Sequence, residues 1–240
     1  MRVVLIAAAL TLAACQSGTA TRPPALPPPA PALGAGASGG AESAAGERYR
    51  IDAQRSELLV LVYRDGRMAS LGHNHVIAVR QLSGVVVVAG DLGQSRWQLD
   101  FPVDALSVDE PQLRAAQGEQ FQTTLDDAAI AGTREHMLGA ALLDAPSFPV
   151  IHLESEQVLT GDDGLRLSAR IRVRDHTARI NVPVTLERTA DELIASGEFD
   201  LTHAELGLTP YSVALGALRV ADRMRVRYRL VARRDRDAPP

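Results

Sequence analysis

The stretch LRLSARIRV, residues 165–173, alternates apolar and polar side chains at every position. Leucine, alanine, isoleucine and valine occupy its odd positions, and arginine or serine its even ones. A period of two is typical of an antiparallel β-strand with one buried face and one solvated face. Residues 223–230, RMRVRYRL, repeat the pattern with four arginines on the polar face. These two segments predict an all-β fold.

Six further segments show the same alternation or a short apolar run of strand length, which brings the predicted total to about eight strands. The sequence GDDG at 161–164 is typical of a hairpin turn between two of them. Eight antiparallel strands can close into a barrel whose interior holds one small ligand. The predicted fold is therefore a closed or nearly closed, antiparallel, eight-stranded β-barrel. The six segments are residues 58–63, 84–88, 97–103, 150–158, 180–186 and 193–201.

Residues 103–149 do not alternate and are too long for a plain connection between strands. Pro111 suits the first position of a helix, and residues 126–131 and 133–143 are rich in alanine. We expect a helical or loop excursion that caps one end of the barrel.

The chain begins MRVVLIAAALTLAAC, with Arg2 before an apolar run and small residues before Cys15, which is the outline of a secretory signal. LAAC, residues 12–15, resembles a bacterial lipobox, in which cleavage precedes an acylated cysteine. The predicted organisation is a signal at 1–14, a lipidated Cys15 opening an unfolded linker at 15–46, a barrel domain at 47–235 and a tail at 236–240. We expect anchoring on the periplasmic side of a bacterial membrane, and Gln16 favours the outer membrane.

Composition restricts the function. The net charge of −4 argues against nucleic acid as the main partner. No nucleophile is placed beside a base, and the G-x-S-x-G match at residues 36–40 lies in the linker, so we expect a binding protein and not an enzyme. The arginine rows of residues 166–172 and 223–229 allow two interpretations, an ordinary polar outer face or a surface for anionic lipid. No sequence feature marks a protein partner.

His73 and His75 belong to the run GHNHVI, residues 72–77. On a strand, both imidazoles would point to one side and could bind zinc or copper with a third ligand. Alternatively, the run makes a tight turn into a strand, and its side chains hydrogen-bond the capping segment or the polar head of a ligand. Both interpretations stay open from the sequence; the second is favoured.

Five segments together resemble the YceI family. They are YRID at 49–52, GHNHVI at 72–77, REHML at 134–138, SFP followed by IHLES at 147–155, and LGLTPYS at 206–212. The resemblance implies a lipocalin-like barrel and a periplasmic protein that binds a long isoprenoid, such as a polyprenyl quinone. The implied barrel is extended and antiparallel, and its implied ligand is a polyprenyl quinone or another isoprenoid; no cofactor is certain.

An isoprenoid tail has no hydrogen-bonding groups, so its pocket should be apolar and uncharged, with a driving force of about 25 cal/mol per Å² buried. Alternation selects nine residues as expected lining of such a pocket. We therefore predict a lipid-anchored barrel that holds an isoprenoid-like or other apolar lipid; the alternative is a histidine metalloprotein. The nine residues are Trp97, Leu99, Phe101, Leu153, Ile171, Val184, Phe199, Val226 and Tyr228.

Overall fold

The computed structural model of the chain describes residues 46–161 and 164–236. The predicted signal, Cys15, nearly all of the linker and the end of the tail lie outside these residues. Among the described residues, no helix is long and apolar enough to cross a bilayer. The strands are β1 (Gly46–Ile51), β2 (Glu57–Asp65), β3 (His75–Val79), β4 (Ser83–Ala89), β5 (Arg96–Pro102), β6 (Leu106–Val108), β7 (Val150–Gly161), β8 (Gly164–Val173), β9 (His176–Arg188), β10 (Glu192–Thr202), β11 (Ser212–Val213) and β12 (Leu218–Arg234).

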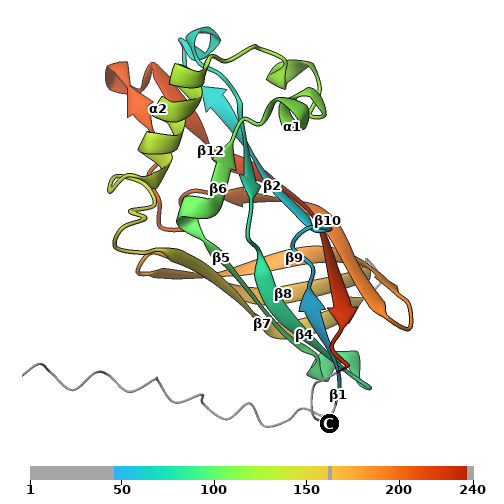
Figure 1. Ribbon diagram of the computed structural model, residues 1–240. Coiled ribbons are helices and arrows are strands. Elements are labelled where there is room, and N and C mark those ends of the chain that lie inside the picture. The colour runs from blue at the N-terminus through green and yellow to red at the C-terminus, as the bar shows by residue number, and fades with distance from the viewer. Residues whose placement is uncertain (1–45, 162–163, 237–240) are drawn as a thin grey trace, which may run out of the picture. The chain divides into compact units, whose positions relative to one another are not determined.

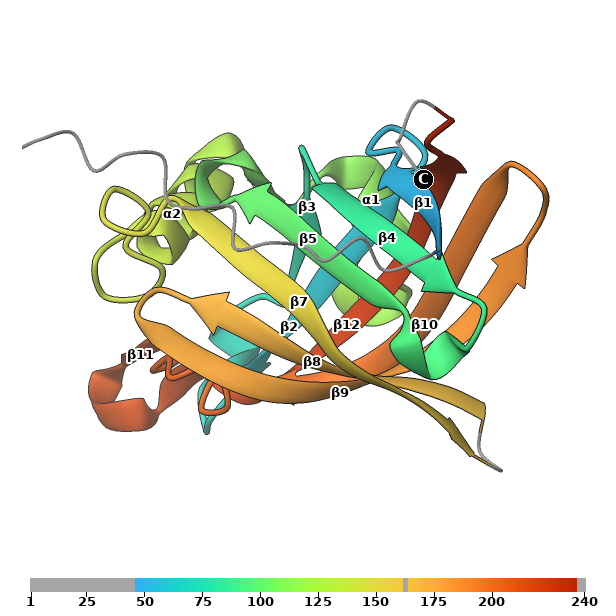
Figure 2. The same ribbon diagram turned by 90° about the horizontal axis from the view of Figure 1, so that it is seen from below.

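Eight strands close into an antiparallel barrel (Figures 1 and 2). Their order around the ring is β1-β4-β5-β7-β8-β9-β10-β12, and β12 pairs with β1 to complete it. The predicted barrel is confirmed. One member differs, because the eighth strand of the ring is β1 and not the predicted segment 58–63, which forms β2. The inner side chains of β1 are Glu47, Tyr49 and Ile51, and the acidic residue among them weakens the apolar alternation in the sequence.

β12 supports two neighbours along its second edge. Its last residues pair with β1, and its earlier part, from Arg219 to Arg229, pairs with β2. β3 adds to β2 and β6 adds to β3, so the wall continues beyond the ring on this side. The strands β6 and β11 were not predicted from the sequence, and β3 was expected only as the strand that follows the GHNH turn.

The segment after β5 forms the expected cap at one end of the barrel (Figure 1). It contains α1 (Pro111–Ala115), with proline in its first turn, and α2 (Asp127–Leu138). The Asp126 carboxylate accepts a hydrogen bond from the Ala129 N–H (2.8 Å), which caps α2. The alanine-rich segment was expected to continue to residue 143, but the helix ends at Leu138 because Gly139 takes an extended conformation. Short 3₁₀ turns occur at Ala69–Leu71, Leu92–Gln94, Val103–Ala105, Glu119–Phe121 and Ala214–Gly216.

β2 and β3 are covered on both faces. Their inner side chains face the barrel interior, and on the other face Leu59, Leu61 and Val76 pack against Phe121 of the capping segment. Phe121 is fully buried. This second apolar cluster fixes the cap to the barrel wall.

Arginines on the outer wall pair with carboxylates of neighbouring strands. Arg170 lies 2.6 Å from Glu154, and Arg227 lies 2.6 Å from Glu198. Exposed pairs of this kind contribute about 0–1 kcal/mol each. The pairing favours the interpretation of the arginine rows as an ordinary polar face.

Candidate ligand-binding site

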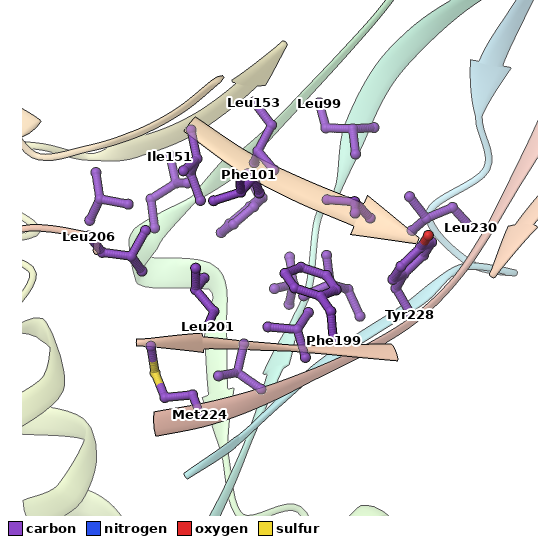
Figure 3. Close-up of a pocket in the computed structure, with 18 of the residues that line it drawn as sticks. Leu99, Phe101, Ile151, Leu153, Phe199, Leu201, Leu206, Met224, Tyr228 and Leu230 are labelled. Atoms are coloured by element: carbon purple, nitrogen blue, oxygen red, sulfur yellow. The ribbon is translucent and has the colours of Figure 1, made fainter. Parts of the chain in front are cut away.

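The inner faces of the strands surround a cavity of about 430 Å³, within the range of ordinary ligand sites, roughly 300–1,000 Å³. Leucine, valine and isoleucine from nearly every strand line it, together with three residues near the end of α2 and after it: Met137, Leu142 and Leu143. Among the described residues that line it, none carries a carboxylate or a guanidinium group. Figure 3 shows side chains converging from several strands. Such a surface suits an apolar molecule.

All nine residues selected by alternation line this cavity. Phe199 and Tyr228 meet edge to face, with ring centroids 6.4 Å apart. Whether any of the nine contacts a ligand stays a prediction. The selection missed the contribution of β2 and β3, although residues 58–63 alternate like the others, because the sequence does not show that this strand faces the same interior. The nine are Trp97, Leu99, Phe101, Leu153, Ile171, Val184, Phe199, Val226 and Tyr228.

The hydroxyl group of Tyr228 is hydrogen-bonded within the barrel wall. It donates a hydrogen bond to the Pro183 carbonyl oxygen at 2.6 Å. Burial raises the pKa of Tyr228 well above its ordinary value. The residue therefore presents an apolar ring to the cavity and a satisfied hydroxyl to the backbone.

Asn74, in the GHNH run, joins the turn to the capping segment. It is buried, its amide oxygen accepts from the Arg64 N–H (3.0 Å), and its amide nitrogen donates to the Gln120 carbonyl (3.0 Å). The contact with the capping segment agrees with the second interpretation of this run. It also explains how the start of β3 is fixed under the cap.

His75 belongs to a buried polar network at the start of β3. Its Nδ1 lies 2.6 Å from Oδ2 of Asp109, whose side chain is fully buried. The other carboxylate oxygen accepts from the Val76 N–H (2.9 Å) and from Nη1 of Arg114 (2.6 Å). Arg114, itself buried, also donates to the carbonyl oxygens of Asn74 and Thr123. Groups from the turn, β3 and the capping segment thus orient one imidazole through Asp109.

The carboxyl group of Asp109 remains ionised in this network. Burial by itself raises the pKa of Asp109, but the hydrogen bonds from His75 and the Val76 N–H, together with Arg114, outweigh burial and lower it. An ionised carboxylate can only accept, so His75 donates from Nδ1. The network therefore fixes the tautomer and the orientation of the ring.

The metal interpretation of His73 and His75 finds no support in this geometry. Residues 46–161 and 164–236 contain no group of three or more histidine, cysteine or acidic side chains placed to hold an ion. Burial, and then the neighbouring His75, lower the pKa of His73. Among the described residues, the two histidines therefore have no third ligand with which to hold an ion.

The family model described as "YceI-like domain" matches residues 49–232. The chain belongs to the YceI-like family. The barrel of this YceI-like protein resembles Burkholderia cenocepacia BcnA, with a TM-score of 0.54 and 13% identity, over 75% of this chain and 98% of the other. It also resembles a polyisoprenoid binding domain from Saccharophagus degradans implicated in plant cell wall breakdown, with a TM-score of 0.52 and 14% identity, over 78% and 98%. No curated protein matches the sequence.

The α2 end of the cavity in this YceI-like protein is its polar end. His75, His136, His203 and Tyr211 all line the cavity. The rings of His136 and Tyr211 lie 4.8 Å apart, and Nδ1 of His203 lies 2.9 Å from the Asp222 carbonyl oxygen. The contact between His136 and Tyr211 was not predicted from the sequence. The two residues belong to the motifs REHML and LGLTPYS, and no spacing rule connects these motifs.

A second histidine–aspartate pair lies on the outside of the barrel. Nδ1 of His152, on β7, contacts the Asp100 carboxylate on β5, beside Glu154 and Arg170. The neighbours of His152 in sequence, Ile151 and Leu153, line the interior. The same side-chain pair therefore occurs once toward the cavity, at His75, and once toward solvent.

Proposed function

We propose that this protein binds an isoprenoid-like or other apolar lipid inside its barrel, and that it acts as a binding protein and not as an enzyme. The observation that carries the proposal is the uncharged cavity of about 430 Å³ inside the closed sheet. Burying hydrocarbon there gains about 25 cal/mol per Å² of apolar surface removed from water.

The comparisons support the same ligand class. One structure of similar fold is described as a polyisoprenoid binding domain, and the family model covers most of the folded region. At 14% identity that structure supports the fold, and the lining of this cavity is what extends the ligand class to this chain. A polyprenyl quinone or another isoprenoid is the proposed occupant.

The proposed location is the periplasmic side of a bacterial membrane, to which an acylated Cys15 would anchor the protein. The LAAC sequence at residues 12–15 supports acylation there, and the proline- and glycine-rich linker to residue 46 would serve as a tether. Two or more acyl chains anchor a protein stably, where one chain binds only marginally. Cys15→Ala is expected to move the protein from the membrane pellet to the soluble fraction and to abolish incorporation of labelled palmitate; a protein that stays in the pellet would contradict the anchor.

The ligand can be tested by extraction. The full chain, purified from a bacterial envelope, is extracted with organic solvent, and the extract is analysed by mass spectrometry. We expect an apolar lipid near one molecule per protein. The cavity variant is Ala195→Trp, because Ala195 lines the interior on β10.

Ser196→Trp is the matched control, since the next residue of a strand points to the opposite face. Ala195→Trp should lose most of the lipid, while Ser196→Trp should keep it. Circular dichroism verifies that both variants fold. An unloaded wild-type protein, or equal loading in the two variants, would overturn the proposed function.

A further inference from the structure

Most polar groups of the cavity wall already have protein partners. The Tyr228 hydroxyl donates to Pro183, the Thr133 hydroxyl donates to the Ala129 carbonyl (2.9 Å), and the Ser95 hydroxyl accepts from the Ala89 N–H (3.2 Å). None of these groups needs a ligand. Any polar contact with an occupant must therefore be made elsewhere on the wall.

The indole N–H of Trp97, on β5, has no hydrogen-bond partner, and the remaining polar side chains lie together at the α2 end. His75 pairs with Val62 across β2, Val62 pairs with Met224 on β12, and Met224 pairs with Leu201 on β10, two residues before His203. α2 supplies His136, which contacts Tyr211. One register of the sheet thus places the polar lining at one end of an otherwise apolar cavity.

His75 is the most rigidly held of these groups. Its ring lines the cavity, its Nδ1 donates to Asp109, and Asp109 is fixed by Arg114 and the Val76 N–H. In the neutral ring with this tautomer, Nε2 carries the lone pair and acts as an acceptor. Among the described residues, no donor pairs with Nε2.

A buried ion pair such as Asp109–Arg114 contributes little net stability, because dehydration of the charges offsets their attraction. Its clearest effect here is to orient the imidazole of His75. A wall that only had to bind hydrocarbon would be served equally well by an apolar residue at this position.

We propose that Nε2 of His75 accepts a hydrogen bond from a hydroxyl group on the head of the bound lipid. The inference rests on the proposed function and deepens it, since it names the ligand class as an apolar chain that ends in a hydroxyl. A ligand without a donor leaves Nε2 unpaired inside the cavity, and its binding is weaker for that reason. Asp109 is a positioning residue that acts through His75.

The test compares two probes with the same tail, farnesol and farnesyl methyl ether, which differ in the hydroxyl hydrogen. Binding to the delipidated full chain is followed by fluorescence of Trp97, the only tryptophan, which lines the cavity. We expect farnesol to bind about three- to ten-fold more tightly than the ether, the effect of one net hydrogen bond. His75→Leu should bind both probes equally.

His152→Leu is the matched control. This variant removes a histidine whose Nδ1 also contacts an aspartate carboxylate, but on the outer wall, and it should keep the preference for farnesol. Equal affinities in the wild type, or a preference that survives His75→Leu, would overturn this inference and leave the proposed function standing. Failure of both probes to bind any variant would overturn both proposals.

A second measurement uses the unmutated protein, in case His75→Leu does not fold. In the chain labelled with ¹⁵N-histidine, farnesol should shift the Nε2 resonance of His75 in the direction of an accepted hydrogen bond, while the ether should not. The outer-wall His152 is the internal reference. No difference between the probes at His75 contradicts the assignment.

Discussion

Asp109 combines two energetically unfavourable features, a left-handed backbone conformation and a buried charge. It adopts a left-handed backbone conformation, with φ of 56°, which aspartate tolerates better than most residues. Its side chain is fully buried and accepts from His75, Val76 and Arg114. Each donor satisfies part of a charge that would otherwise be very unfavourable in the interior. The three donors therefore depend on this carboxylate as much as it depends on them.

Asp109→Asn should lower the free energy of unfolding by about 3–5 kcal/mol, because it leaves the buried Arg114 guanidinium without its counter-charge. Urea unfolding at pH 7 measures the loss. Asp100→Asn is the matched control, since it breaks the exposed pair with His152 and should cost about 0–1 kcal/mol. Similar losses in the two variants would show that the Asp109 network is not a buried charge cluster.

The contribution of Asp109 should also depend on pH. Its pKa is lower in the folded protein than its ordinary value, about 3.9 in an unfolded chain. A carboxyl group of this kind stabilises the fold above its unfolded pKa, and the contribution is lost as pH falls through the folded pKa. The difference in unfolding free energy between wild type and Asp109→Asn should be constant from pH 7 to about 5 and shrink at lower pH. A difference independent of pH would contradict an ionised Asp109.

At the scale of elements, the ladder between β9 and β10 is short, with four residue pairs along two long strands. Their ladder extends from Leu193 opposite Arg188 to Ser196 opposite Thr185, and it stops before Pro183, which has no N–H to donate. The Tyr228 hydroxyl satisfies the Pro183 carbonyl instead. This contact requires a close approach at Gly197, where a Cβ would lie 2.3 Å from the Pro183 oxygen.

Gly197→Ala should therefore destabilise the protein by about 1–3 kcal/mol, the usual cost of forcing extra volume into a packed site. Gly132→Ala is the opposite case. Gly132 lies within α2 and a Cβ there meets nothing within 4 Å, so alanine should stabilise the helix by about 0.5–1 kcal/mol. Thermal unfolding should show shifts of opposite sign, and shifts of the same sign would show that the β9–β10 seam adapts to the added methyl group.

Sequence patterns predicted those elements that carry their own periodicity. The alternating segments became strands, and their apolar faces became the cavity wall, since each pattern states locally which side chains share a face. β6 was missed because it has only three residues, and β1 because its place in the ring depends on pairing with the distant strands β4 and β12. β3 was expected only as the strand that follows the GHNH turn. The network of His75, Asp109 and Arg114 was also missed, because its members meet only when the capping segment folds onto β3. A sequence spacing of 34 residues between His75 and Asp109 gives no local signal.

At the scale of the whole molecule, the barrel encloses a cavity instead of a close-packed core. Close-packed interiors stabilise a protein through contacts that the lining of an empty cavity lacks. The cap, the ring and the β2–β3–β6 extension each contribute one side of that lining. A ligand that fills the cavity would therefore connect all three parts and stabilise the molecule as a unit.

Loading should thus raise the melting temperature of the protein. Ligand at about 100 times its Kd adds about 2.7 kcal/mol to the free energy of unfolding, and each kcal/mol shifts Tm by roughly 2–4 °C in a domain of this size. Calorimetry of delipidated and farnesol-loaded protein should show a rise of about 5–10 °C, obtained from the product of those two quantities. Ser196→Trp should show the same rise, and Ala195→Trp, whose indole occupies the cavity, little or none. A rise that is equal in both variants would place the ligand outside the barrel, because only an occupant of the interior competes with the Ala195→Trp side chain.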